Sequence, residues 1–176
     1  MIRVLVLLLF LSGCYADEVN PATRPEPFFD LAGYIDAQVD SLTELRPTVS
    51  KTIVLNGTTE TKEMRDLNFA NDLRVFRNAD INKPAYLDKY RLDRHESGDT
   101  LIQTYTATDS TLETRELVVY TVSQRPERIS ILRRTGTVLS DGLHRLDYDP
   151  GAGYRMRTEQ TNRFGKDLDA VITVGW

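Results

Sequence analysis

The sequence predicts an α+β domain in which an N-terminal helix and a second, shorter helix pack on a long, curved antiparallel β-sheet, as a half-barrel or an open barrel. Three observations support this fold class. Apolar residues recur at helical spacing over residues 28–45. A shorter helical pattern follows over residues 65–78. From Tyr86 to Trp176 apolar and polar residues alternate between turn signals, as they do in β-strands.

Composition divides the 176 residues into three parts. Residues 1–13 start with a basic region at Arg3 and continue as an apolar run, which is the layout of a secretory signal. Residues 14–27 contain three prolines and three acidic residues without apolar periodicity, so we interpret them as a tether. Residues 28–176 are long enough for one domain with a single hydrophobic core.

The apolar run ends in Leu11-Ser12-Gly13-Cys14, which resembles the lipobox of bacterial lipoproteins. The resemblance implies cleavage before Cys14, a diacylglyceryl thioether on its sulfur, and lipid anchoring in the bacterial cell envelope, with the outer membrane as the expected membrane. A transmembrane helix is the weaker alternative, because it needs about 20 apolar residues. Cys14 is the only cysteine in the chain, so no intramolecular disulfide is expected.

The segment Tyr15-Ala16-Asp17-Glu18 is similar to the acidic surface-export signals of Bacteroidota-type lipoproteins, although Tyr15 departs from their pattern. That resemblance implies exposure at the cell surface. A solvated acidic spacer is an equally good interpretation of the same residues.

The helix predicted over residues 28–45 opens the domain. Its apolar residues form one stripe: Phe28, Leu31, Ile35, Val39, Leu42 and Leu45. Pro27 suits a first helical turn, and Pro47 ends the helix because the residue before a proline avoids the helical conformation. The stripe is too short for a stable coiled coil, so we expect the helix to cover the sheet.

A β-hairpin and the second helix come next. Asn56-Gly57 separates two extended runs within residues 48–65, and this dipeptide is the strongest short signal for a hairpin turn. The second helix is predicted over residues 65–78, with Leu67, Ala70, Leu73 and Phe76 on one face. The segment around Pro84 then breaks the helical pattern.

The remainder predicts a meander of seven strands. Their expected spans are 90–96, 100–108, 112–122, 128–134, 143–148, 154–162 and 168–174, with a turn at 124–127. Connections this short allow only antiparallel pairing between neighbours. One face of each strand is apolar and the other is polar, which is typical of an antiparallel sheet covered on one side. We expect six apolar positions to line a cavity between sheet and helix: Leu117, Val119, Ile129, Ile131, Ile172 and Val174.

The sequence predicts no catalytic, cofactor-binding or metal-ligating residue. The two histidines, His95 and His144, have no metal-site spacing, and no phosphate-binding or nucleophile motif is present. Asp93, His95 and Glu96 are a candidate acid/base cluster, but they share a solvated strand end and have no nucleophile. We therefore expect a protein that is not an enzyme.

The segment Asp147-Tyr148-Asp149-Pro150-Gly151 weakly resembles a calcium-binding loop, because it has two carboxylates two residues apart and a glycine. It lacks a third ligand and the closing glutamate, so a hairpin turn is the preferred interpretation.

Arginine and tyrosine are frequent in the predicted strands. The arginines late in the chain could form an anion-binding patch, or they could pair across strands with the interleaved carboxylates. We favour the cross-strand ion pairs. Tyrosines are either ordinary strand residues or the lining of a cavity. The formal net charge of −4 argues against a nucleic-acid partner.

The order of elements, a leading helix followed by a long antiparallel meander, resembles the half-barrel lipoprotein carriers and chaperones of bacterial envelopes. The resemblance implies an apolar or lipid ligand held between sheet and helix. The alternative is a structural or interaction subunit of an envelope complex whose core is filled by its own side chains. In both hypotheses the chain contacts the membrane through the Cys14 lipid and needs no cofactor.

Overall fold

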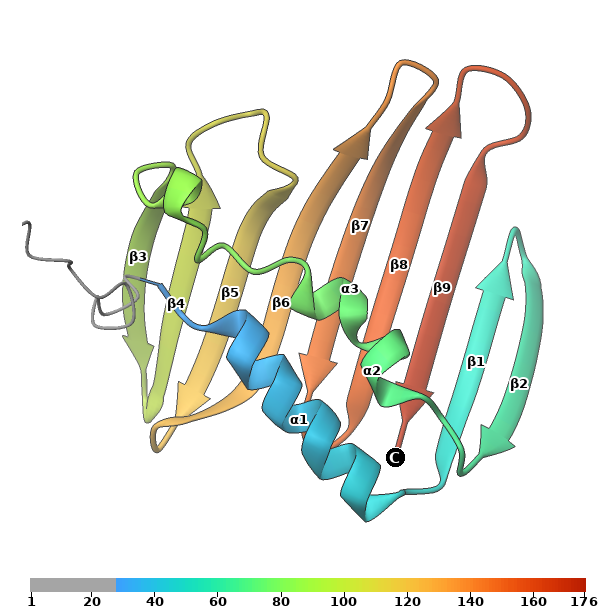
Figure 1. Cartoon of the computed structure of the whole chain (residues 1–176), viewed down its shortest axis with the longest axis horizontal. Helices are drawn as coiled ribbons and strands as arrows, with labels where there is room; N and C mark the ends of the chain where they lie inside the picture. Colours follow the sequence, from blue (N-terminus) through green and yellow to red (C-terminus); the bar gives the residue numbers. More distant parts are fainter. Residues whose placement is uncertain (1–27) are drawn as a thin grey trace, which may run out of the picture.

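The computed structural model describes residues 28–176, which form an α+β domain with three α-helices on one face of a nine-stranded antiparallel sheet (Figure 1). The sheet is open, with β2 at one edge and β3 at the other. The predicted fold class is therefore confirmed, in its open form. The expected signal peptide and tether, including Pro27 and the predicted lipidation site Cys14, lie outside the described residues.

Helix α1 (Leu31–Leu45) begins at a capping residue: Asp30 Oδ1 accepts a hydrogen bond from the backbone N–H of Gly33 at 2.8 Å. Its buried residues, Leu31, Ile35 and Leu42, belong to the predicted stripe. Leu45 was expected on the same stripe but is 70% exposed. The reason is that the last turn of α1 runs past the strands that the helix covers (Figure 1).

The second helix differs from its prediction. Residues 65–78 hold two four-residue helices, α2 (Phe69–Asp72) and α3 (Arg74–Arg77), in place of one continuous helix. The side chain of Asn68 accepts a hydrogen bond from Asn71 N at 2.9 Å and so fixes the start of α2 after residue 67. Phe69, Leu73 and Phe76 are nevertheless buried, because both short helices turn their apolar side toward the sheet.

The sheet has the order β2-β1-β9-β8-β7-β6-β5-β4-β3, and every pairing is antiparallel. The first hairpin therefore joins the meander beside its last strand. The strand bounds are β1 (Val49–Leu55), β2 (Thr58–Met64), β3 (Tyr90–Ser97), β4 (Thr100–Ala107), β5 (Thr114–Val122), β6 (Arg125–Gly136), β7 (Ser140–Asp149), β8 (Gly153–Asn162) and β9 (Leu168–Gly175). A short 3₁₀ helix, η2 (Pro84–Tyr86), precedes β3.

The turn between β5 and β6 lies earlier than predicted. Ser123 and Gln124 form it with φ values of 48° and 66°, so β6 already begins at Arg125. Pro126 sits inside the strand next to a register shift, where its missing N–H interrupts the ladder least. The predicted turn at 124–127 is therefore wrong by about two residues, because Pro126, a residue typical of turns, lies inside β6.

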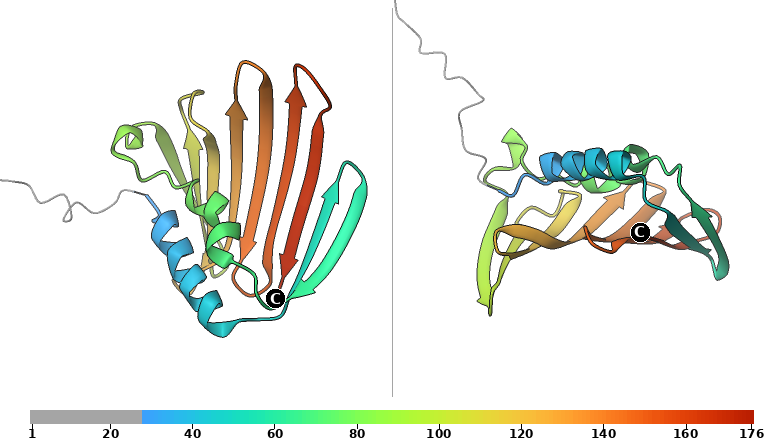
Figure 2. Two further views of the ribbon diagram at one scale, coloured as in Figure 1. Left: turned by 45° about the vertical axis from the view of Figure 1, so that its right-hand side comes forward. Right: turned by 90° about the horizontal axis from the view of Figure 1, so that it is seen from below.

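The helices form a single layer over one face of the twisted sheet (Figure 2). Edge-to-face aromatic pairs fill much of the space between the two layers. The ring of Phe76 lies 5.9 Å from that of Tyr148 and 5.7 Å from that of Tyr154. Trp176 packs 6.1 Å from Tyr148 on the other side. This arrangement places the core under α1, α2 and α3.

Candidate functional site

The six residues expected to line a cavity lie on the helix-side face of the sheet. Leu117, Val119, Ile129, Ile131 and Val174 are at most 3% exposed and belong to the hydrophobic core, while Ile172 is half-buried at its margin. Leu117 and Val119 pair directly with Ile131 and Ile129 across β5 and β6. The structure therefore brings these residues together as packing positions of the core.

Buried tyrosines complete that core, and their hydroxyl groups are satisfied by other elements. Tyr148 donates to Gln38 Oε1 on α1 at 3.0 Å, and Tyr90 donates to the backbone oxygen of Thr114 at 2.7 Å. Burial raises the pKa of Tyr90 to about 12. These contacts give Tyr148 and Tyr90 a structural role, with the polar end of each ring used to join elements.

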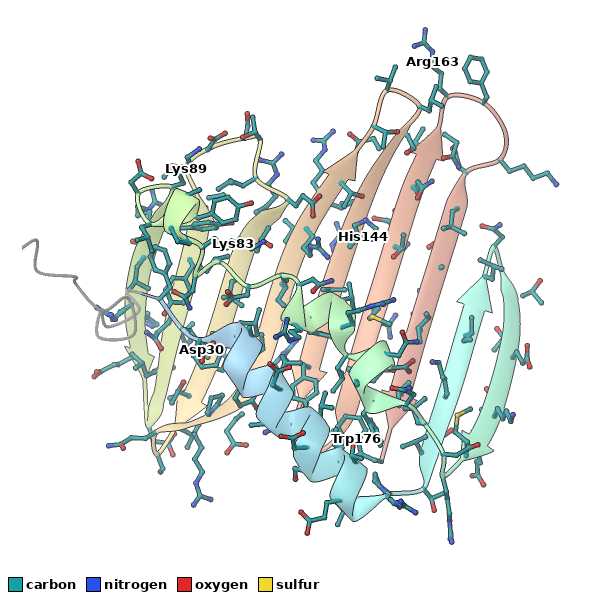
Figure 3. The ribbon with its side chains drawn as sticks, in the orientation of Figure 1. Asp30, Lys83, Lys89, His144, Arg163 and Trp176 are labelled. Carbon is teal, nitrogen blue, oxygen red and sulfur yellow. The ribbon has the colours of Figure 1, made fainter. Side chains whose placement is uncertain are left out.

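The helices cover only part of the helix-side face. Beyond α3, toward the far ends of β6, β7 and β8, the face carries polar side chains, and His144 is visible there (Figure 3). The imidazole of His144 lies between two hydroxyl groups: Thr135 Oγ1 is 2.8 Å from Nε2, and Thr158 Oγ1 is 3.0 Å from Nδ1. Three neighbouring strands thus contribute one residue each to a polar chain, which we call the His144 network (Thr135, His144 and Thr158).

Gly142 makes room for this network. A Cβ atom at residue 142 would lie 2.8 Å from Thr135 Oγ1 and 3.0 Å from His144 Nε2. Any larger residue would therefore push apart the two groups that form the hydrogen bond.

The surroundings of His144 favour the neutral form of its imidazole. Its pKa is lowered, first because burial desolvates the charged form and second because the Arg133 guanidinium is close. Arg133 pairs with Glu113 Oε2 at 2.5 Å, and the Arg133 side chain is only 12% exposed. Arg133 Nε is buried without a hydrogen-bond partner among the described residues.

Thr158, the third residue of the His144 network, limits the chemistry that the network can perform. Thr135 and His144 have the spacing of a nucleophile and its base, but Thr158 occupies the place where a carboxylate would orient the ring and stabilise an imidazolium. Of the two charges near the imidazole, the Arg133 guanidinium opposes proton uptake more than the Glu113 carboxylate favours it. The arrangement fits a neutral hydrogen-bond bridge across three strands better than an acid/base pair.

A polar pocket of about 320 Å³ opens beside this region. Its lining comes from the loop after α3, from η2 and from the start of β5: Asn78, Asp80, Lys83, Tyr86, Thr111, Glu113 and Thr114. Lys83 Nζ lies 5.2 Å from the centre of the Tyr86 ring. Burial raises the pKa of Asp80, whose Oδ1 has no hydrogen-bond partner among the described residues. Further pockets of 270, 240 and 220 Å³ lie between α1 and α3 and along the outer face of β5 to β8.

The arginine-rich strands place most of their guanidinium groups on the outer face, opposite the helices. Arg128 contacts Asp147 at 3.3 Å, and Arg134 contacts Asp141 at 2.9 Å. Arg145 and Arg157 both contact Glu159, at 2.7 and 2.9 Å. The two arginines lower the pKa of the Glu159 carboxyl group. Ion pairing within and across strands, the interpretation we favoured, accounts for these residues.

The other two sequence candidates do not assemble into a site. Asp93 contacts Arg91 on its own strand at 2.9 Å, and Asp93, His95 and Glu96 are all exposed on the edge strand β3. Asp149 Oδ1 accepts a hydrogen bond from Gly151 N at 2.8 Å, which makes the segment around it a hairpin turn. Within residues 28–176 no group of three or more His, Cys, Asp or Glu side chains is arranged to hold a metal ion.

Sequence reasoning missed a half-buried cluster that holds α2 on the sheet. Asp72 Oδ2 accepts hydrogen bonds from Lys51 Nζ on β1, at 2.6 Å, and from the Tyr154 hydroxyl group on β8. The three residues are far apart in the chain, and β1 and β8 come together only through β9. No local pattern could have revealed this contact.

No family model matches the chain, and comparison with curated proteins and with solved structures gives no match either. In the described part of the chain, every helix is too short or too polar to span a bilayer.

Proposed function

We propose that this chain is a lipoprotein of the bacterial cell envelope, tethered through a lipid on Cys14, and that its domain is a non-enzymatic interaction subunit of an envelope assembly. The lipobox-like sequence Leu11-Ser12-Gly13-Cys14 and the Pro-containing segment after it support the tether. The rest of the proposal concerns what the domain does at the end of that tether.

One observation favours an interaction subunit over a carrier. The space between sheet and helices is occupied by the protein's own side chains, including Phe76, Tyr148 and Leu117, each at most 1% exposed. A carrier needs an unfilled apolar space to hold its ligand, and a close-packed core offers none. The absence of a carboxylate from the His144 network supports a role without catalysis.

The carrier hypothesis is supported by a different observation. Met156 and Ile172 are half-buried on the helix-side face, where they lie against the core. An apolar ligand would extend the core there by covering these two side chains. The carrier function is therefore the second candidate.

Native mass spectrometry of the full-length chain, after its release from detergent micelles, distinguishes the interaction function from the carrier function. We expect the mass of the acylated chain alone, and no gain in fluorescence when an environment-sensitive apolar dye is added at neutral pH. A co-purifying apolar molecule that is displaced by the dye would favour the carrier.

The anchor is tested by Cys14→Ala. This variant should lose the acyl mass and be left uncleaved or soluble, while a matched Ser12→Ala variant should keep the acyl mass and remain in the membrane fraction. A Cys14→Ala variant that still fractionates with membranes through its own domain would contradict the lipid tether.

A further inference from the structure

Within residues 28–176, strand β2 forms one edge of the sheet: it pairs with β1 on one side and with no other described strand (Figure 1). Residues 58–63 are all exposed, and only Met64 is half-buried. An edge strand has a row of backbone N–H and C=O groups that are free to pair with another strand. The strand contains no proline or glycine that would interrupt such pairing.

The hairpin turn determines which backbone groups are free. Asn56 and Gly57 form a two-residue turn with φ values of 48° and 87°, and Leu55 and Thr58 are the pair that closes it. In such a hairpin the closing pair is hydrogen-bonded, and hydrogen-bonded pairs alternate along an antiparallel ladder. The backbone groups of Thr59, Thr61 and Glu63 therefore point away from β1.

We propose that this edge pairs with the same edge of a second copy of the chain, antiparallel and centred on Thr61. Thr61 then lies opposite the partner's Thr61, and all seven residues of β2 are paired. Glu60 lies opposite the partner's Lys62, and by symmetry Lys62 lies opposite the partner's Glu60. Directly opposite side chains of opposite charge stabilise a pair of strands.

The neighbouring registers are disfavoured by charge. Two copies of β2 form a ladder only when residues whose backbone groups point away from β1 lie opposite one another. The nearest alternative registers that satisfy this condition are centred on Glu60 or on Lys62. The first places Glu60 opposite the partner's Glu60, and the second places Lys62 opposite the partner's Lys62. Like charges directly opposite destabilise a strand pair. The sequence of β2 therefore selects the register centred on Thr61.

Pairing about a two-fold axis uses the same edge of both copies, so assembly stops at a dimer in which the two sheets form one continuous sheet. An interface of two strands is small, so we expect weak association in dilute solution. If both copies are tethered to one membrane, which rests on the function proposed above, their effective concentration rises and the dimer is favoured.

Disulfide trapping in the full-length chain tests the register. Hydrogen-bonded antiparallel pairs have Cα atoms about 5.5 Å apart, which is within the range of a disulfide. Thr61→Cys should give a covalent dimer on mild oxidation. Thr59→Cys alone and Glu63→Cys alone should stay at the background set by the unsubstituted chain, which keeps Cys14, while a mixture of the two should give heterodimers. Equal trapping at residues 59, 61 and 63 would overturn the register.

Charge exchange tests the interface without new cysteines and does not depend on the lipid anchor. Sedimentation of the full-length chain should show a dissociation constant about tenfold higher for Glu60→Lys or Lys62→Glu than for the unsubstituted chain. The double exchange E60K/K62E should restore dimerisation, and mixing the two single variants should give heterodimers. The residues are exposed, so the far-ultraviolet circular dichroism of every variant should be unchanged.

The opposite edge provides the control. Arg94→Glu on β3 should leave the dimer intact, because β3 lies at the other end of the sheet. Dissociation by Arg94→Glu, or a monomer at every concentration for the unsubstituted chain, would overturn the proposal.

Discussion

Lys51 Nζ lies 2.6 Å from Asp72 Oδ2, so the side chain of an edge-proximal strand holds a four-residue helix in place. The two side chains are only 18% and 14% exposed, and the Tyr154 hydroxyl group donates to the same carboxylate oxygen. Because α2 is too short to be stable alone, it depends on this contact and on the burial of Phe69.

Asp72→Ala should lower the free energy of unfolding by about 2 kcal/mol, because it removes the acceptor of the half-buried Lys51 ammonium and of the hydroxyl group of the buried Tyr154. Denaturation by urea measures the loss. Asp36→Ala is the matched control: it breaks an ion pair with Arg77 in which both side chains are 51% exposed, so a change below about 0.5 kcal/mol is expected. Equal losses for the two variants would mean that Asp72 does not fasten α2.

Ile35→Asp should unfold the domain at ordinary temperatures. Ile35 lies on the buried face of α1 and is fully buried, and placing an unpaired carboxylate there costs several kcal/mol, comparable with the total stability of a small domain. The exposed neighbour Asp40 provides the contrast, since Asp40→Ala should change the melting temperature little. A folded Ile35→Asp variant with an unchanged melting temperature would show that α1 does not contribute to the core.

Gly153→Ala should destabilise the domain by about 3 kcal/mol. Gly153 has a φ of 129°, and a Cβ atom there would lie 1.9 Å from the carbonyl oxygen of Val174 on β9. Gly165 also has a positive φ, of 98°, but its Cβ would meet open space, so Gly165→Ala should cost only about 1 kcal/mol. Thermal melts measure the loss of stability in each variant. Gly165→Ala reports backbone strain alone, and Gly153→Ala reports backbone strain together with the steric clash against β9.

The stability of the domain should fall between neutral and mildly acidic pH partly because of His144. Its folded-state pKa lies below the ordinary value of 6.5, so as pH falls through 6.5 the unfolded chain binds a proton at this residue that the folded chain does not. The free energy of unfolding therefore decreases until the pH reaches the lowered folded-state pKa. His144→Gln removes this contribution. Urea titrations at several pH values should show parallel curves for the two proteins above pH 7 and a shallower fall for His144→Gln below it.

A His144→Gln variant whose free energy of unfolding keeps the same pH dependence as the unsubstituted chain would show that His144 is not held neutral by burial and by Arg133. The test is independent of any catalytic role, because it measures folding alone.

Much of the fold could be predicted from the sequence because its signals are local. The spacing of four, four and three residues between Leu31, Ile35, Val39 and Leu42 identifies a helix and its buried face without any knowledge of the partner strands. The alternation of apolar and polar residues along most of β9 and similar strands, together with Asn56-Gly57 and the other short turns, predicts antiparallel neighbours. Local signals failed where one residue outweighed the pattern: the helix expected from residue 65 begins only after Asn68, whose side chain caps α2.

The sequence by itself therefore determined the fold class, the meander, the buried face of α1 and the lipobox-like start. Only the tertiary structure decided that β1 pairs with β9, which leaves β2 as a free edge, and that Asp72 meets Lys51 and Tyr154. It likewise decided that His144 bridges Thr135 and Thr158 beside Arg133. The physical reason is sequence separation: periodicity and turn chemistry act over a few residues, whereas these contacts depend on which distant strands become neighbours in the sheet.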